Sequence, residues 1–285
     1  ACAVLLGWAA WLGRMQSSYA YWTWMAIGMG LVLGAIAAVV WYGRTRVCDH
    51  MRPRPLLLVI LFVGIAVRLL LWPTDRYISD DIYRYHCDGK VLCHGTNPYR
   101  HPPNAPHLKG LRIHPIDQRI NHPHIRTVYP PLAQALFAIG YLLSPGRVTG
   151  LRSLFLLSEI ACWLLLALLL QRRVRDREPG AGLLAFGPGQ KSSAPKAPWA
   201  SWLVLVLAIW SPLCLIDGYL PGHLDLLALP WLALFLLALH DKRGWLAGLA
   251  LAAACLIKPL GVIFVPAAAR HLGVRRTIAA AGVFT

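Results

Sequence analysis

Acidic residues are scarce in this chain, which has only 12 Asp and Glu among 285 residues, against 28 Lys and Arg. All charged residues together make up 14% of the sequence, hydrophobic residues make up 57%, and the mean hydropathy is +0.53. This composition excludes an ordinary soluble domain. Apolar stretches close to the roughly 20 residues needed to cross the hydrocarbon of a bilayer recur along the chain. The sequence therefore predicts an all-α membrane protein with several spans.

Signatures of nucleotide use are also missing, since no Walker, Rossmann, kinase or nucleophile-elbow pattern is present. No RNA- or DNA-binding motif accompanies the net charge of +16. The basic residues gather instead in loops between apolar stretches, as the positive-inside rule describes for cytoplasmic loops. We therefore expect membrane lipids as partners and no nucleic acid. The basic segments are 43–55, 172–198, 241–244 and 270–276.

The apolar stretches divide the chain into two parts. Residues 1–55 are predicted to hold N-terminal transmembrane helices and a cytoplasmic basic loop, and residues 56–285 a transmembrane module. The alternative for residues 1–13 is the apolar region of a signal peptide. Because the chain lacks an initiator Met and ends in an apolar stretch, we expect a fragment truncated at its C-terminus. The predicted spans are 19–42, 56–73, 152–171, 199–217 and 223–240, with a partial one at 1–13.

The charge rule also orients the chain. With 43–55 in the cytoplasm, residues 74–128 form a large extracytoplasmic loop. The following run, 132–143, is too short to cross comfortably, and Tyr129-Pro130-Pro131 gives it an extended entry. We therefore expect a juxtamembrane helix within 129–146, lying in the outer interface, and a cytoplasmic linker at 172–198.

Two short helices are also expected near the end of the chain. Basic residues flank the apolar stretch 245–269 on both sides, so a single crossing would leave one basic group outside. Two half-length helices broken at Lys258-Pro259 keep both groups inside. Such breaks line a cavity or pack against protein, which would place Lys258 in a cavity facing outward.

The candidate catalytic residues lie in "SDDIYRYHCDGK", at the start of the large loop. Asp80 and Asp81 form a carboxylate pair, in which one acid can act as general base while its neighbour tunes it. Lys258 suits a phosphate group, and His223 could donate a hydrogen bond to it. We expect the acid pair, the turn 217–225 and Lys258 to meet on one face.

Structural roles are the alternatives for each of these residues. An Asp before a helix often caps it, and His223 could cap the helix that follows it. Lys258 and Arg68 could extend to the membrane interface. Arg152 could pair with Glu159 in the same apolar stretch.

Histidine and cysteine carry weaker signals. No two loop histidines bracket a Cys or an acid at a tight ligand spacing, so a metal site is the less favoured interpretation. Cys87 and Cys93 could form a disulfide in the loop. The other cysteines read as small apolar residues. The loop histidines are His86, His94, His101, His107, His114, His122 and His124.

The order of several motifs is similar to that of a known superfamily. "SDDIYRYHCDGKVLCHGTNPY" is followed by "INHPHIRTVYPPLAQALFAIG", "WSPLCLIDGYLPGHLDLLALP" and "LAGLALAAACLIKP". From about Leu56 to Ala269 the chain resembles bacterial GT-C glycosyltransferases of the polyprenyl-phosphate-mannose-dependent mannosyltransferase type. The resemblance implies a multi-pass helical bundle of the GT-C type in the bacterial inner membrane, with its active site on the extracytoplasmic face.

The resemblance also implies roles for the candidate residues. Asp80 would deprotonate the acceptor hydroxyl, Asp81 would assist or hold a divalent cation, and no other cofactor is implied. The donor would be a polyprenyl-phosphate-linked sugar, with mannose as the family default, and the acceptor a glycan or a lipid. A lipid flippase or secondary transporter is the alternative function. The substrate-binding candidates are Lys258, His223, Asp225, Arg152, Tyr129, Tyr83, Asp88 and Asn97.

Overall fold

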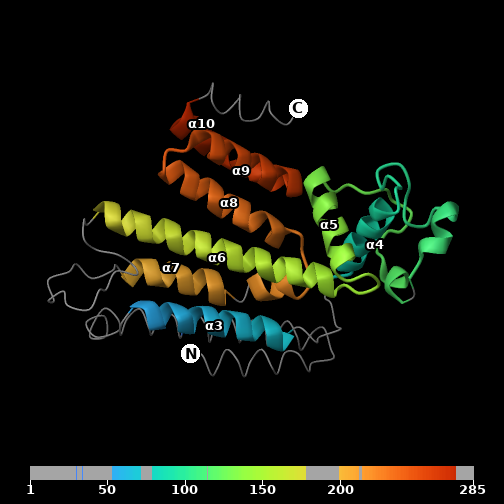
Figure 1. Ribbon diagram of the computed structural model, residues 1–285, viewed down its shortest axis with the longest axis horizontal. Coiled ribbons are helices and arrows are strands. Elements are labelled where there is room, and N and C mark those ends of the chain that lie inside the picture. Colours follow the sequence, from blue (N-terminus) through green and yellow to red (C-terminus); the bar gives the residue numbers. More distant parts are fainter. Residues whose placement is uncertain are drawn as a thin grey trace. The chain divides into compact units, whose positions relative to one another are not determined.

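The computed structural model describes residues 53–71, 79–113, 115–177, 199–211 and 214–273, together with Gly30 and Gly34 (Figure 1). Every regular element in these ranges is a helix, which agrees with the predicted all-α class. The predicted spans 1–13 and 19–42, most of the basic loop 43–55 and the linker beyond residue 177 lie outside the described residues. The chain forms two compact units, Ala1–Asp75 with Leu166–Ile216, and Arg76–Leu165 with Asp217–Thr285.

In the first unit, α3 (Pro53–Leu71) packs against α7 (Trp199–Trp210). Arg68 is fully buried between them and donates hydrogen bonds to the carbonyls of Gly64 (3.2 Å) and Ile209 (2.9 Å). The indole of Trp210 donates in return to the carbonyl of Ile60 (2.9 Å). The proposed extension of Arg68 to the membrane interface is therefore wrong, because a cation at the C-terminus of α7 has unpaired carbonyls to satisfy.

The predicted span 199–217 is not one continuous α-helix. α7 ends at Trp210, two residues before Pro212, because a proline disfavours the helical conformation of its predecessor. A π-helical turn, Cys214–Tyr219, follows.

In the second unit, α4 (Asp81–Cys93) crosses α5 (Pro131–Leu143) closely. A Cβ added at Gly89 would collide with the backbone carbonyl of Phe137, so the two backbones touch there. α5 begins at Pro131, as the Pro130-Pro131 entry predicts. α6 (Thr149–Arg177) follows it and belongs to the second unit up to Leu165 and to the first unit from Leu166. The loop between α4 and α5 holds two short 3-10 helices, η2 (Pro106–Leu111) and η3 (Ile116–Arg119).

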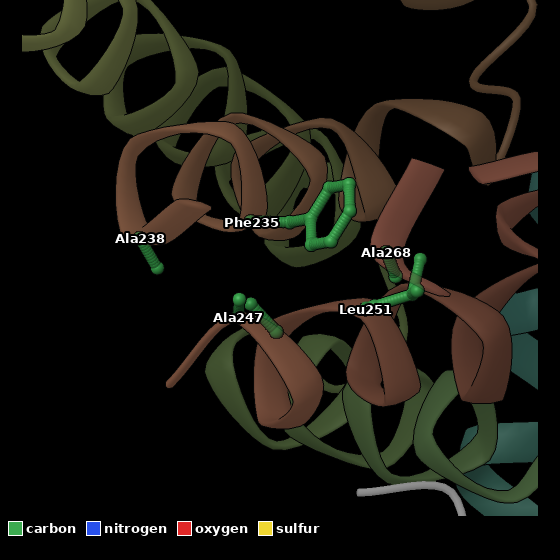
Figure 2. Packing of buried hydrophobic residues seen from close by; sticks show 6 residues of the cluster. Phe235, Ala238, Ala247, Leu251 and Ala268 are labelled. Atoms are coloured by element: carbon green, nitrogen blue, oxygen red, sulfur yellow. The ribbon is translucent and has the colours of Figure 1, made fainter. Parts of the chain in front are cut away.

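The rest of the second unit is built on a helical hairpin. α8 (Asp225–His240) and α9 (Gly244–Ile257) lie side by side, joined by a three-residue turn (Figure 1). Small side chains let them approach closely, with Phe235 filling the space between them (Figure 2). The helix ends at Ile257 and resumes as the 3-10 helix η5 (Pro259–Phe264) and α10 (Val265–Leu272), which confirms the break at Lys258-Pro259. The buried cluster consists of Phe235, Ala238, Ala247, Ala250, Leu251 and Ala268.

One helix among the described residues is long and apolar enough to cross a bilayer, Thr149–Asp176, and an 18-residue window within it has a mean hydropathy of 2.3. It contains the predicted span 152–171. The helices at the predicted spans 56–73 and 223–240 are apolar but shorter, as are α5 and α9. The helical nature of these stretches is confirmed, while the number of crossings stays a prediction.

The contact at Gly89 makes the α4–α5 crossing testable. Gly89→Ala forces a methyl group against rigid backbone, so it should lower the free energy of unfolding by on the order of 2–3 kcal/mol. Gly110→Ala is the matched control, since nothing lies within 4 Å of its Cβ position. Thermal unfolding in detergent micelles would measure both, and equal midpoints for the two variants would contradict the crossing.

Candidate active site

The acid pair lies at the first turn of α4. Asp80 occupies the N-cap position, but its side chain makes no capping hydrogen bond. The hydroxyl of Ser79 instead accepts the backbone N–H of Asp81 (3.2 Å). The capping alternative therefore does not explain the Asp80 carboxylate, whose side chain remains 50% exposed.

The two carboxylates have different neighbours. The amide of Asn121 donates to Oδ1 of Asp81 (2.7 Å), and Nε2 of His223 lies 3.9 Å from its Oδ2. A guanidinium nitrogen of Arg119 lies 3.7 Å from Oδ1 of Asp80. The same guanidinium lies over the ring of Tyr83, 4.3 Å from its centre, which is a cation–π arrangement. Asp81 is thus held by an amide, and Asp80 faces a cation.

The turn before α8 brings His223 to the acid pair. Gly222 has φ +69°, and a Cβ there would lie 3.0 Å from the Ile82 side chain, so the turn packs directly on α4. The backbone N–H of His223 donates to the carbonyl of Gly218 (2.9 Å), which closes the turn. The N-cap position of α8 is occupied by Leu224, and His223 is the residue before it.

Lys258 lies at the open end of the α8–α9 hairpin. Its ammonium contacts both carboxylate oxygens of Asp225 at 2.5 Å. Asp225 is the first residue of α8, two positions after His223, and Lys258 directly follows α9. The structure gives Lys258 a carboxylate as its partner, while its place relative to the membrane stays a prediction. The turn 217–225 therefore links this ion pair to the acid pair.

Two other candidates lie in the packing between α4 and α5. Asp88 is buried, accepts hydrogen bonds from Arg84 (2.9 Å) and Gln134 (3.2 Å), and its pKa is raised by desolvation. Tyr129 makes an edge contact with Tyr85 (ring centres 5.0 Å apart). Burial, with the charge of Asp81 nearby, raises the pKa of Tyr129 to about 12. Both side chains therefore belong to the packing of α4 against its neighbours.

The remaining candidates are Asn97, Arg152 and Tyr83. Asn97 is exposed, and its side-chain oxygen accepts the backbone N–H of Tyr99 (2.8 Å) in a turn. Arg152 and Glu159 are both buried on α6, seven residues apart. Tyr83 does lie at the site, beneath the guanidinium of Arg119.

The structure corrects the disulfide alternative. Cys87 and Cys93 are both free thiols on α4, where a six-residue spacing places them on different sides of the helix. Cys87 is buried, and desolvation raises its pKa to about 12, whereas Cys93 is exposed. Among the described residues, which exclude His114, no group of three or more His, Cys, Asp or Glu could hold a metal ion.

Sequence reasoning missed Arg119, Asn121 and the ion pair that anchors them. Lys90 on α4 contacts Asp117 at 2.5 Å, with side chains 3% and 8% exposed. These partners lie 27 or more residues apart, and no local pattern marks an exposed Arg or Asn in an irregular loop as part of a site.

His86 is a further buried group on α4. Neither ring nitrogen has a hydrogen-bond partner among the described residues, and Tyr141 packs edge-on against it. Desolvation, followed by the nearby positive charge of Lys90, lowers the pKa of His86 to about 4.

A comparison with protein families defines the class as a membrane glycosyltransferase of the GT-C type. The chain matches the model of glycosyltransferase family 87 over residues 127–285, more than half of its length, and it belongs to this family. The matched part includes His223, Asp225 and Lys258, whereas the acid pair precedes it. No curated protein and no solved structure matches the chain.

The family membership confirms the GT-C resemblance and the enzyme class, against the transporter alternative. Members of this family are membrane proteins, in agreement with the apolar composition. The sugar, the donor, the acceptor, the membrane and its face stay predictions.

The state of the α4 thiols can be checked by peptide mass spectrometry. Native protein treated with N-ethylmaleimide at pH 8 should be labelled at Cys93, while Cys87 should react only after denaturation, because its thiol is buried and its pKa is raised. A peptide cross-linked between Cys87 and Cys93 in unreduced protein would contradict the structure.

His86 should make stability depend on pH. Its folded pKa lies below the unfolded value of about 6.5, so the unfolded chain binds the proton first as pH falls. Stability is full above about pH 6.5, and on the order of 2–3 kcal/mol is lost as pH falls towards 4.

The replacement His86→Leu removes the titrating group, so the variant should lose less stability than wild type between pH 7.5 and pH 4.5. The thermal midpoint of each protein at the two pH values would measure this loss, and the fall in midpoint of wild type is compared with that of the variant. The same pH sensitivity in both proteins would show that His86 is not responsible.

Proposed function

We propose that the protein transfers a sugar, by family default mannose, from a polyprenyl-phosphate donor to an extracytoplasmic glycan or lipid acceptor, with inversion at the anomeric carbon. The observation that carries the proposal is the acid pair at the start of α4, set against His223 and, through the turn 217–225, next to the Lys258–Asp225 pair. This arrangement combines a proton acceptor with cations at one end of the second unit.

Asp80 is the proposed general base. Its carboxylate is half exposed and carries no capping bond, so an acceptor hydroxyl can reach it. A base within hydrogen-bond distance of that hydroxyl takes its proton as the oxygen attacks the anomeric carbon. Asp81, fixed by Asn121, assists from the adjacent position.

The cations serve the leaving group. As the bond between sugar and phosphate breaks, the phosphate gains negative charge and the sugar becomes oxocarbenium-like. Fixed positive charges at that place stabilise the transition state more than the ground state. Lys258 and His223 are the proposed partners of the phosphate, with Arg152 on α6 as a further cation.

A lipid-linked donor accounts for the absence of a nucleotide motif, because the activated sugar arrives through the bilayer. A lipid-linked donor also favours a multi-pass chain in the bacterial inner membrane. In such a chain the site lies at the outer face and α5 lies in the membrane interface. A divalent cation bound by Asp80 and Asp81 is the alternative to a purely protein-based site, and a chelator distinguishes the two.

The test is transfer of radiolabelled mannose from polyprenyl-phosphate mannose to a mixed glycan and lipid acceptor pool, in nanodiscs, with and without EDTA. Asp80→Asn should lower transfer at least a hundredfold while the lipid donor still binds, because only proton abstraction is lost. Asp81→Asn should lower it less. Asp241→Asn, in the turn at the opposite end of the α8–α9 hairpin, is the matched control and should transfer like wild type.

Unchanged transfer in Asp80→Asn would overturn the assignment of the base. Labelled lipid that changes leaflet without any transfer would favour the flippase function instead.

A further inference from the structure

We propose that residues 116–121 form a positioning segment for the acid pair, in which Asn121 orients Asp81 and Arg119 sets the charge environment of Asp80. The inference deepens the proposed function and rests on its assignment of Asp80 as the base. Neither the family match, which begins at residue 127, nor any sequence motif assigns a role to this segment.

The segment runs alongside α4 in the opposite direction. Its beginning is tied to the far end of the helix by the ion pair between Asp117 and Lys90. Its end reaches the first turn, where Asn121 contacts Asp81. The helix that carries the acids therefore also carries the anchor of the segment that holds them.

The anchor is buried, and one oxygen of its carboxylate accepts two hydrogen bonds. Asp117 Oδ2 accepts the ammonium of Lys90 and the backbone N–H of Ile113, each at 2.5 Å. A buried ion pair with further hydrogen bonds fixes geometry, since either charge left alone would be strongly unfavourable. The register between the segment and α4 is thereby set before any substrate binds.

Asn121 supplies directional contact. Its amide donates to one oxygen of Asp81 at 2.7 Å, so the other oxygen is directed towards His223, 3.9 Å away. An amide has no charge to titrate, and this orientation therefore persists across the working pH range. Catalytic groups need such support, because small losses of alignment cost large factors in rate.

Arg119 supplies charge. Its guanidinium lies over the ring of Tyr83 and 3.7 Å from Asp80, so the ring restricts the side chain beside the carboxylate. A permanent positive charge is thereby placed next to the proposed base and attracts its carboxylate. The charged and titratable groups that face the acid pair from the packed elements are Arg119, Tyr83, Tyr85, Tyr129 and His223.

The first test measures the kinetics of transfer. Arg119→Gln should lower kcat about threefold with KM unchanged, the size of effect that a partly exposed ion pair supports. Arg119→Lys should restore the wild-type kcat, because it keeps the charge. Asn121→Leu, similar in shape but without the donor, should lower kcat about tenfold or more with KM within about threefold. Thermal midpoints equal to wild type would show that these effects are not losses of fold.

The second test does not depend on the donor. Carbodiimide coupled to glycine ethyl ester modifies accessible carboxyl groups, and peptide mass spectrometry reports the extent of modification at Asp80 and Asp81 separately. At one fixed pH, Arg119→Gln should increase modification at Asp80, which loses its neighbouring guanidinium. Asn121→Leu should increase modification at Asp81, which loses its hydrogen bond, and Asp241→Asn should change neither.

The two tests separate failure of the inference from failure of the proposed function. Changed modification of Asp80 and Asp81 in the variants of a protein that transfers no sugar from the lipid donor would support the segment and overturn the donor. Wild-type kinetics and unchanged carboxyl modification in both variants would overturn the segment.

Discussion

One buried guanidinium connects α4, the helix that carries the acid pair, to the elements around it. Arg84, on α4, donates to Asp88 (2.9 Å) and also to the carbonyls of His122 (3.3 Å) and Ile125 (2.8 Å). Asp88 in turn accepts from Gln134 on α5. Burial of such charges is costly unless each donor finds an acceptor, and here the loop backbone supplies the missing ones. The loop that leads into α5, and with it Tyr129, takes its place from this network.

The sequence contains enough local information to locate several elements of this fold. Pro130-Pro131 defines the start of α5 and Lys258-Pro259 the end of α9, because proline restricts its own backbone and that of its predecessor. The acid pair stands out by the scarcity of acids. These inferences depend on a few neighbouring residues, and the structure agrees with them.

Long-range partners could not be found in this way. Arg68 reads as an interfacial arginine until the carbonyl of Ile209, 141 residues later, is seen to accept its hydrogen bond. Asn121 and Arg119 reach the acid pair only because a buried ion pair sets the register of an irregular loop along α4. The disulfide alternative failed for a related reason, since the two cysteines share a helix that directs them apart.

The contact between Lys258 and Asp225 has a consequence for product release. The pair is neutral as a whole, so the hairpin end carries no net charge into an apolar surrounding. If Lys258 takes the departing phosphate as proposed, that phosphate must compete with a carboxylate already in contact. After transfer, Asp225 can reclaim the ammonium at once, and the enzyme exchanges one anion for another instead of leaving a bare cation behind. A strongly held lipid phosphate would otherwise block the next turnover.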